Sequence, residues 1–289
     1  MMFEEKKIKE LVLTTLVADS YSLGSHWIYD EKQLENLEIN WDELNDAKAI
    51  WHKDKKIGDF THFGDQTLWL YQFLQDKSSF DVDEYINFWQ TKIETYNGYI
   101  DGATRDTLEN IKNEKKPTGS ASTDLSIIGR IAPLLLVSNS KNEFFTNVEN
   151  FVKCTHNSNE AIVASKFFAS LLIEVLEGND LEASILALKE QFDTKIQTFI
   201  SKAIASKDEE TFDAIRDFGP ACDIEGGFEG VIHMLYKYDN LKEMLVNNAK
   251  AGGDTSARAM IASLIFMAQK NKTISQIPEN WLNIKATII

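Results

Sequence analysis

The sequence predicts an all-α protein, built as a single-domain bundle of many helices. Apolar residues recur at three- and four-residue spacing in segment after segment, whereas the polar–apolar alternation of β-strands is almost absent. Only four prolines and 14 glycines occur in 289 residues, so disorder and low complexity are not expected. Short polar residues also precede several apolar segments, where they can cap the first turn of a helix.

Two apolar stripes predict helices in the first hundred residues. Side chains within residues 8–16 follow the i, i+3, i+4, i+7 spacing of one helix face. A second stripe covers residues 82–96, where Asp81 and Glu84 form a capping-box-like start and Asn97-Gly98 forms a stop. Each segment is expected to bury one face.

Two more helices are expected in the second half of the chain. Asn157 and Glu160 bracket the start of one, which ends before Gly178. Ser206 together with Glu209 predicts the capped start of a shorter one.

The stretches between the predicted helices indicate where the loops lie and whether the chain is divided into domains. Residues 40–64, 98–125 and 218–230 hold much of the Gly, Asp, Ser and Trp content and are expected to be loops. No linker divides the chain, so residues 1–289 are expected to form one domain.

Composition excludes several classes of function. A net charge of −15 argues against nucleic acid as a partner, although a small anionic ligand remains compatible with it. The charged N-terminus has no signal-peptide pattern, and no apolar run approaches the roughly 20 residues that span a membrane. Cys154 and Cys222 lack the spacing of a zinc or disulfide framework. We expect a soluble cytoplasmic protein; the sequence makes no prediction of its oligomeric state.

Two distant stretches share a Gly-Asp pattern ahead of an apolar helix. Asp65 lies in THFGDQT and Asp254 lies in AGGDTSA. Helix capping alone accounts for either aspartate. Their similarity favours more than capping, because both are followed by side chains with oxygen atoms that suit a hard cation such as Mg²⁺. These neighbours are Gln66, Thr67, Thr255 and Ser256.

A third stretch, VADSYSLGSHWIYD, holds two further candidates. Asp19 ends an apolar helical stripe, where a charged residue normally faces solvent. His26 follows a glycine-containing turn, and it fits a ligand, a general acid or base, or a hydrogen-bonded core residue.

Later segments add an arginine, a histidine and two acids. Arg130 interrupts an apolar stretch, so it needs a polar partner or lies at the edge of the core. The loop 119–124 before it can hold an anion. His156 precedes a helix start, where capping explains it equally well. Asp223 and Glu225 lie in an irregular segment and fit either the surface or the lip of a cleft.

In this order the motifs resemble those of the ADP-ribosylglycohydrolase family, in particular its J1-crystallin-like branch. The resemblance covers nearly the whole chain. ADSYSLGSHWIYD is similar to the first Gly-Asp helix motif of the family, HFGDQT to its Thr-Asp-Asp-Thr motif and GRIAPLL to its Met-Arg-x-x-Pro stretch. CTHN is similar to the Thr-His motif, and AGGDTSA to the terminal Gly-Gly-Asp-Thr-Asp-Thr.

The resemblance implies an all-α fold with a central cleft and a glycosidic hydrolysis. In active members two Mg²⁺ ions bind ribose hydroxyls and activate a water that cleaves the bond at C1″ of ADP-ribose. A glutamate from the first motif and acids from the second and last motifs hold these ions. The usual substrates are ADP-ribosyl-arginine, ADP-ribosyl-serine or related conjugates.

This sequence departs from the family pattern at the metal ligands. The ligand glutamate falls on His26, the second aspartate of the second motif on Gln66, and an aspartate of the last motif on Ser256. Asp65 and Asp254 remain. Because two nearby divalent ions repel and need carboxylates to offset that repulsion, we expect zero or one weakly bound Mg²⁺ rather than two.

The resemblance also assigns roles to single residues. The catalytic candidates are Asp65, His26 and Asp254, and the candidate ligands of one weak Mg²⁺ are Asp65, Asp254 and Ser256. The candidate substrate-binding residues are Asp19, Gln66, Thr67, Ser120, Arg130, His156 and Gly253.

Two hypotheses about function follow. The first is a hydrolase that cleaves the ribose C1″ bond of an ADP-ribosyl or related ribosyl conjugate at a metal-depleted site, with His26 as general acid or base. The second is a catalytically inactive, crystallin-like structural or ligand-binding protein that retains the fold.

Overall fold

The computed structural model describes residues 2–289, and helices form all of its regular elements. In the described chain, β-type pairing is limited to three isolated bridges. The all-α prediction is confirmed; the single-domain interpretation stays a prediction. The α-helices are α1 (Glu5–Ser22), α2 (Glu31–Glu35), α3 (His62–Leu74), α4 (Val82–Glu94), α5 (Gly102–Lys112), α6 (Lys141–Thr155), α7 (Asn159–Leu176), α8 (Leu181–Lys189), α9 (Thr194–Ala205), α10 (Thr211–Phe218), α11 (Ile224–Lys237), α12 (Leu241–Ala251) and α13 (Thr255–Ala268). The 3₁₀ helices are η1 (Ile50–His52), η2 (Leu125–Arg130), η3 (Ala132–Val137), η4 (Ile274–Gln276) and η5 (Glu279–Leu282).

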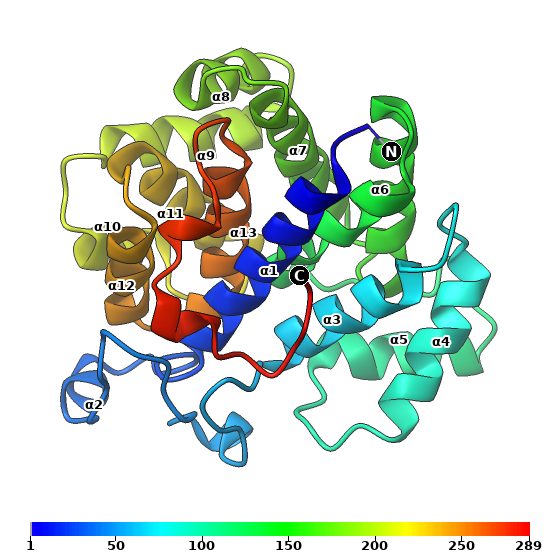
Figure 1. Cartoon of the computed structure of the whole chain (residues 1–289), viewed down its shortest axis with the longest axis horizontal. Helices are drawn as coiled ribbons and strands as arrows, with labels where there is room; N and C mark the ends of the chain where they lie inside the picture. The colour runs from blue at the N-terminus through cyan, green and yellow to red at the C-terminus, as the bar shows by residue number, and fades with distance from the viewer. Residues whose placement is uncertain (1) are drawn as a thin grey trace.

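Helices α1 and α13 pack against each other at the centre of the molecule (Figure 1). Every residue of α13 is buried, as expected of a helix that is apolar on all sides. Helices α9–α12 lie on one side of this pair and α3–α5 on the other (Figure 1). The N-terminal ends of α3 and α13 therefore start close to the last turn of α1.

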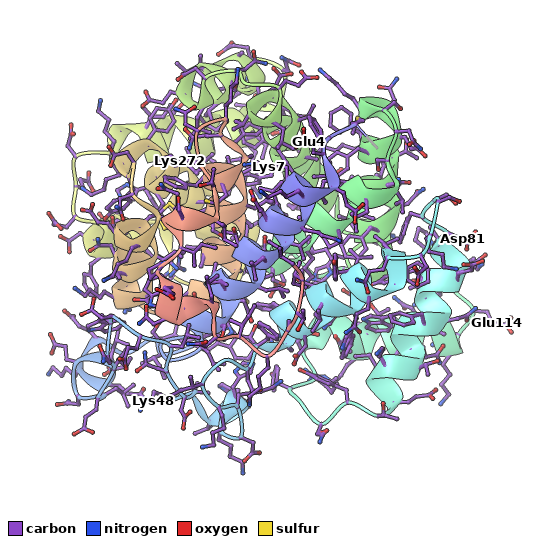
Figure 2. All side chains as sticks on the ribbon, viewed as in Figure 1. Glu4, Lys7, Lys48, Asp81, Glu114 and Lys272 are labelled. Carbon is purple, nitrogen blue, oxygen red and sulfur yellow. The ribbon has the colours of Figure 1, made fainter. Side chains whose placement is uncertain are left out.

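Charged side chains project from the outside of this bundle, as Asp81 and Glu114 show in Figure 2. Asp81 also caps α4 as predicted, because its carboxylate accepts a hydrogen bond from the Glu84 backbone N–H at 2.8 Å. No helix of the described chain is both long and apolar enough to cross a membrane.

Several predicted boundaries are wrong. The loops predicted for 40–64 and 218–230 extend into α3 and α11, which begin at His62 and Ile224, because glycines lie in the first turns of both helices. The loop predicted for 98–125 contains helix α5, whose inward face carries small residues instead of an apolar stripe. Ser206 does not start a helix: it lies at the C-terminal end of α9, and α10 begins at Thr211. The Ser206 hydroxyl instead bonds the carbonyl of Ala203 at 2.8 Å.

Candidate functional site

Asp19 joins the starts of the two helices that carry the Gly-Asp pattern. Its carboxylate is fully buried in the last turn of α1. It accepts hydrogen bonds from the Thr61 backbone N–H at 2.8 Å and from the Thr61 hydroxyl at 2.6 Å, and Thr61 caps α3. It also accepts one from the hydroxyl of Ser256 in the first turn of α13. A single acid thus connects segments that are 42 and 237 positions away in sequence.

Glycines allow these helix starts to approach closely. A Cβ atom on Gly64 would lie 2.2 Å from the Asp19 carboxylate, so only glycine fits there. Gly253 has a φ of +68°, and a Cβ atom on it would lie 2.1 Å from the carbonyl oxygen of Pro220. Its own carbonyl accepts the Trp27 backbone N–H at 2.7 Å. Gly253 therefore contributes its backbone carbonyl, which holds the chain at Trp27, because a side chain has no room there.

Asp65 lies in the first turn of α3, four residues after the Thr61 cap. Its Oδ2 accepts hydrogen bonds from Lys55 Nζ at 2.5 Å and from the Tyr96 hydroxyl at 2.6 Å. Burial raises the pKa of this carboxyl, whereas the charge and hydrogen bond of Lys55 lower it. Its side chain retains 16% exposure. Lys55 thus places an ammonium group directly on the carboxylate.

Gln66 provides a neutral partner for the buried Arg130. Its Oε1 accepts hydrogen bonds from Arg130 Nη1 at 2.9 Å and from Trp89 Nε1 at 3.0 Å. Arg130 Nη2 donates to Ser126 Oγ at 2.7 Å, and its guanidinium lies over the Phe63 ring at 5.2 Å. Arg130 therefore has the polar partner that its burial requires.

Thr67, Ser120 and His156 bond to nearby backbone or side chains. The Thr67 hydroxyl donates to the Phe63 carbonyl one turn earlier, at 2.9 Å. Ser120 Oγ donates to the Thr155 carbonyl at 2.9 Å, and His156 Nδ1 lies 2.9 Å from the Thr155 hydroxyl. Burial lowers the pKa of His156 to about 3, so its ring is neutral at pH 7.

Asp254 is the N-cap of α13, as capping predicts. Its Oδ1 accepts the Ala257 backbone N–H at 3.0 Å and lies 3.4 Å from His26 Nδ1. Its Oδ2 is buried and has no hydrogen-bond partner. Burial and, after it, the negative charge of Asp124 raise the pKa of Asp254 to about 8. Asp254 is therefore largely protonated at neutral pH.

His26 is enclosed by aromatic rings next to Asp254. Its ring stacks on Trp27 with centroids 4.8 Å apart and faces the Phe63 edge at 5.5 Å. Burial, followed by the nearby rings of His52 and His62, lowers its pKa well below the usual value. Its Nε2 has no hydrogen-bond partner. The ring is consequently neutral.

Sequence reasoning missed a chain of polar groups that leads from this cluster to α5. His52 Nε2 lies 3.2 Å from His62 Nδ1, and His62 Nε2 lies 3.3 Å from Asp101 Oδ2. Burial opposes ionisation of Asp101, yet the hydrogen bond and charge of His62 hold its pKa well below the usual range. Burial lowers the pKa of His52 to about 3, and its Nδ1 has no partner.

A surface cavity of about 720 Å³ opens beside these groups. His52, Lys55 and Tyr96 line it, so it reaches both hydrogen-bond partners of Asp65. Trp51 and Tyr99 also line it, with their rings edge to face at 5.6 Å. The wall therefore combines aromatic faces with a cation and a histidine.

A sequence profile described as ADP-ribosylglycohydrolase matches residues 3–285. The chain belongs to the ADP-ribosylglycohydrolase family. Crystallin J1A of Tripedalia cystophora is 24% identical over 300 residues, with 96% of this chain and 91% of the crystallin aligned. Crystallin J1B of the same organism is 21% identical over 296 residues with the same coverage.

A solved structure described as an ADP-ribosylglycohydrolase-related protein complex has the same fold. It superposes with a TM-score of 0.71 and 18% identity, over 96% of this chain and 91% of that chain. The arrangement of helices is therefore that of the ADP-ribosylglycohydrolase family, as the sequence motifs predict. At this identity the likeness concerns the fold alone.

The donor groups of this ADP-ribosylglycohydrolase chain do not fit a magnesium pair. Asp65 is ion-paired with Lys55, and the Ser256 hydroxyl is bonded to Asp19. Asp254 lies against a neutral histidine where the family motif has a glutamate. Mg²⁺ requires several hard oxygen ligands in nearly octahedral geometry, and an ammonium group already neutralises Asp65. We therefore derive no chemical step through magnesium.

Proposed function

We propose that this protein is a hydrolase that cleaves the ribose C1″ glycosidic bond of an ADP-ribosyl or related ribosyl conjugate without a magnesium pair. Family membership supports the reaction class. The observation that carries the metal-free form is the contact of Lys55 with Asp65 at the cavity wall, because a lysine there takes the electrostatic place of a metal ion.

The cavity accounts for binding of the substrate. Trp51 and Tyr99 offer aromatic surfaces for a planar base. Lys55 offers positive charge to phosphate oxygens, in a protein whose net charge is otherwise negative. A ribosyl group placed between them lies against Lys55 and Tyr96, the two hydrogen-bond partners of Asp65. When phosphate draws Lys55 away, the Asp65 carboxylate stabilises the positive charge that develops on the ring in the transition state.

The chain of Asp101, His62 and His52 supplies the proton transfer. His52 lines the cavity, and its buried Nδ1 has no hydrogen-bond partner, so this nitrogen is the one that takes a proton from the attacking water, as a weak base whose pKa burial lowers to about 3. Its Nε2 lies next to His62 Nδ1, and Asp101 beside His62 stays ionised and stabilises the positive charge that the two histidines share, so this charge need not remain on His52 alone. His26 lies behind His52, with ring centroids 5.2 Å apart, and is the second candidate for this role.

Release of ADP-ribose from ADP-ribosyl-arginine and ADP-ribosyl-serine peptides tests the proposal. We expect turnover by the full chain, a large loss with Asp65→Asn, and a larger loss with His52→Ala than with His26→Ala. Asp83→Asn is the control, because Asp83 forms an exposed ion pair with Lys116 and neither residue lines the cavity. Turnover that is indifferent to Asp65 and to both histidines would refute the mechanism.

Two observations favour the second candidate, a crystallin-like ligand-binding or structural protein without catalysis. The curated relatives are crystallins, and Asp65 already has two strong partners within the protein. This alternative predicts that Asp65→Asn and Asp254→Asn lower the melting temperature, whereas no ribosyl conjugate is cleaved by any form. Release of ADP-ribose by the wild-type protein would be enough to rule out this alternative.

A further inference from the structure

Two carboxyl groups and a thiol lie close together at the N-terminal end of α13. Each of Asp124, Cys222 and Asp254 offers a ligand atom, and these atoms lie within 4.8 Å of one another. Asp124 precedes η2, Cys222 lies in the turn before α11, and Asp254 caps α13. Neither Asp124 nor Cys222 is among the candidate site residues that the sequence predicts.

Backbone hydrogen bonds fix the three segments relative to one another. The Leu125 N–H donates to the Cys222 carbonyl at 2.8 Å, and the Ile224 N–H donates to the Thr123 carbonyl at 2.9 Å. On the other side, the Asp254 N–H donates to the Pro220 carbonyl at 2.8 Å. The three side chains are thus preorganised by their main chains, which is a requirement for a metal site.

A buried oxygen in this cluster has no partner. Asp254 is 1% exposed, and its Oδ1 accepts the Ala257 N–H while Oδ2 has no partner with hydrogen-bond geometry, although the Trp27 indole is near enough to this carboxyl to lower its pKa. Leaving a buried carboxyl oxygen unsatisfied is costly, and a bound cation would favour the ionised form of Asp254 over the protonated form. The neighbouring Arg258 does not satisfy it, because its guanidinium bonds to Asn248, to the Gly252 carbonyl and to the Pro220 carbonyl.

We propose that Asp124, Cys222 and Asp254 bind one thiophilic divalent ion of the Zn²⁺ class. A site with one sulfur and two oxygen donors suits Zn²⁺ and similar transition metals, whereas Mg²⁺ selects all-oxygen sites. Three protein ligands leave a fourth position for water or a ligand. This site goes beyond the proposed hydrolysis and does not depend on it.

Metal titration of the full-length, reduced and chelator-treated protein tests the site. We expect one Co²⁺ per chain, with a thiolate-to-cobalt absorption band that Zn²⁺ abolishes by displacement and that Mg²⁺ leaves unchanged. Since loss of an outer-shell partner already weakens metal sites about 10–100-fold, loss of a ligand in Cys222→Ser or Asp124→Asn should weaken binding by at least about 100-fold.

Cys154→Ser is the matched control. Cys154 is the other cysteine, is buried, and its Sγ donates to the Asn150 carbonyl at 3.3 Å. This variant should keep the band and the affinity. A band that persists in Cys222→Ser, that disappears in Cys154→Ser, or that never appears would overturn the proposal.

A measurement on the wild type covers the case in which a variant fails to fold. Cys222 is only partly buried, so an aromatic disulfide reagent reacts with it before it reacts with Cys154. Zn²⁺ should slow this first reaction, and the same concentration of Mg²⁺ should not. Equal rates with Zn²⁺ and without metal would count against the site.

Discussion

Replacement of Lys55 by methionine tests whether an ammonium group neutralises Asp65. Lys55 and Asp65 are 20% and 16% exposed at their side chains, with Nζ and Oδ2 2.5 Å apart. Exposed ion pairs contribute about 0–1 kcal/mol, and breaking a fully buried pair costs about 3–5 kcal/mol. For this partly buried pair we expect Lys55→Met to lower the free energy of unfolding by about 2 kcal/mol at pH 7.

The pH dependence of this loss has a defined sign. Burial already raises the pKa of Asp65, and removal of Lys55 raises it further because the lysine was lowering it. A carboxyl whose folded-state pKa exceeds its unfolded value near 3.9 takes up its proton first in the folded state. The folded state of Lys55→Met therefore regains stability relative to the wild type as the pH falls from 7 toward 4.

Urea unfolding at several pH values measures this effect. Lys116→Met is the control, because the pair of Lys116 with Asp83 is 72% and 73% exposed and should contribute less than about 1 kcal/mol. The double variant Lys55→Met/Asp65→Asn should recover part of the lost stability, since it no longer buries an unpaired acid. Equal losses in Lys55→Met and Lys116→Met, or a loss that grows on acidification, would refute the reasoning.

Three other variants have outcomes that the structure specifies. Gly64→Ala should lower the free energy of unfolding by about 3 kcal/mol, because the new Cβ atom meets the Asp19 carboxylate at 2.2 Å. Gly102→Ala should be neutral or stabilising in the same urea titration, because its nearest neighbour is Arg105 Nη2 at 3.9 Å. His156, with a pKa of about 3 when folded and about 6.5 when unfolded, should make stability fall by about 1.4 kcal/mol per pH unit on acidification within that window. His156→Asn should flatten this slope by that amount, and an unchanged slope would show that the ring is not buried in its neutral form.

The sequence predicted the helices whose buried faces are large and apolar. Helix α4 has such a face, which the apolar stripe of residues 82–96 predicted, and an aspartate cap, which Asp81 and Glu84 predicted. Helix α5 was missed because its buried residues are Ala103, Thr104 and Thr107, which do not form an apolar stripe. Hydrophobic periodicity therefore predicts a helix that buries large apolar side chains, and it does not predict one that packs through small residues.

The only part of the candidate site that the sequence predicted is the part formed by the two Gly-Asp stretches. The similarity of the two Gly-Asp stretches indicated a shared location, and Asp19 provides the link between them. The contact of Asp65 with Lys55 was not predictable, because Lys55 lies in an irregular segment without a pattern that fixes its direction. The same holds for His52, which contacts His62 only through the fold of that segment.

The most direct measurement compares ADP-ribose release from ADP-ribosyl-arginine and ADP-ribosyl-serine peptides in EDTA and in Mg²⁺. Because Lys55 occupies the carboxylate that a magnesium ion would use, the account predicts turnover at the same rate in both buffers. Turnover that appears only with Mg²⁺, together with two bound Mg²⁺ ions per chain by calorimetry, would contradict it.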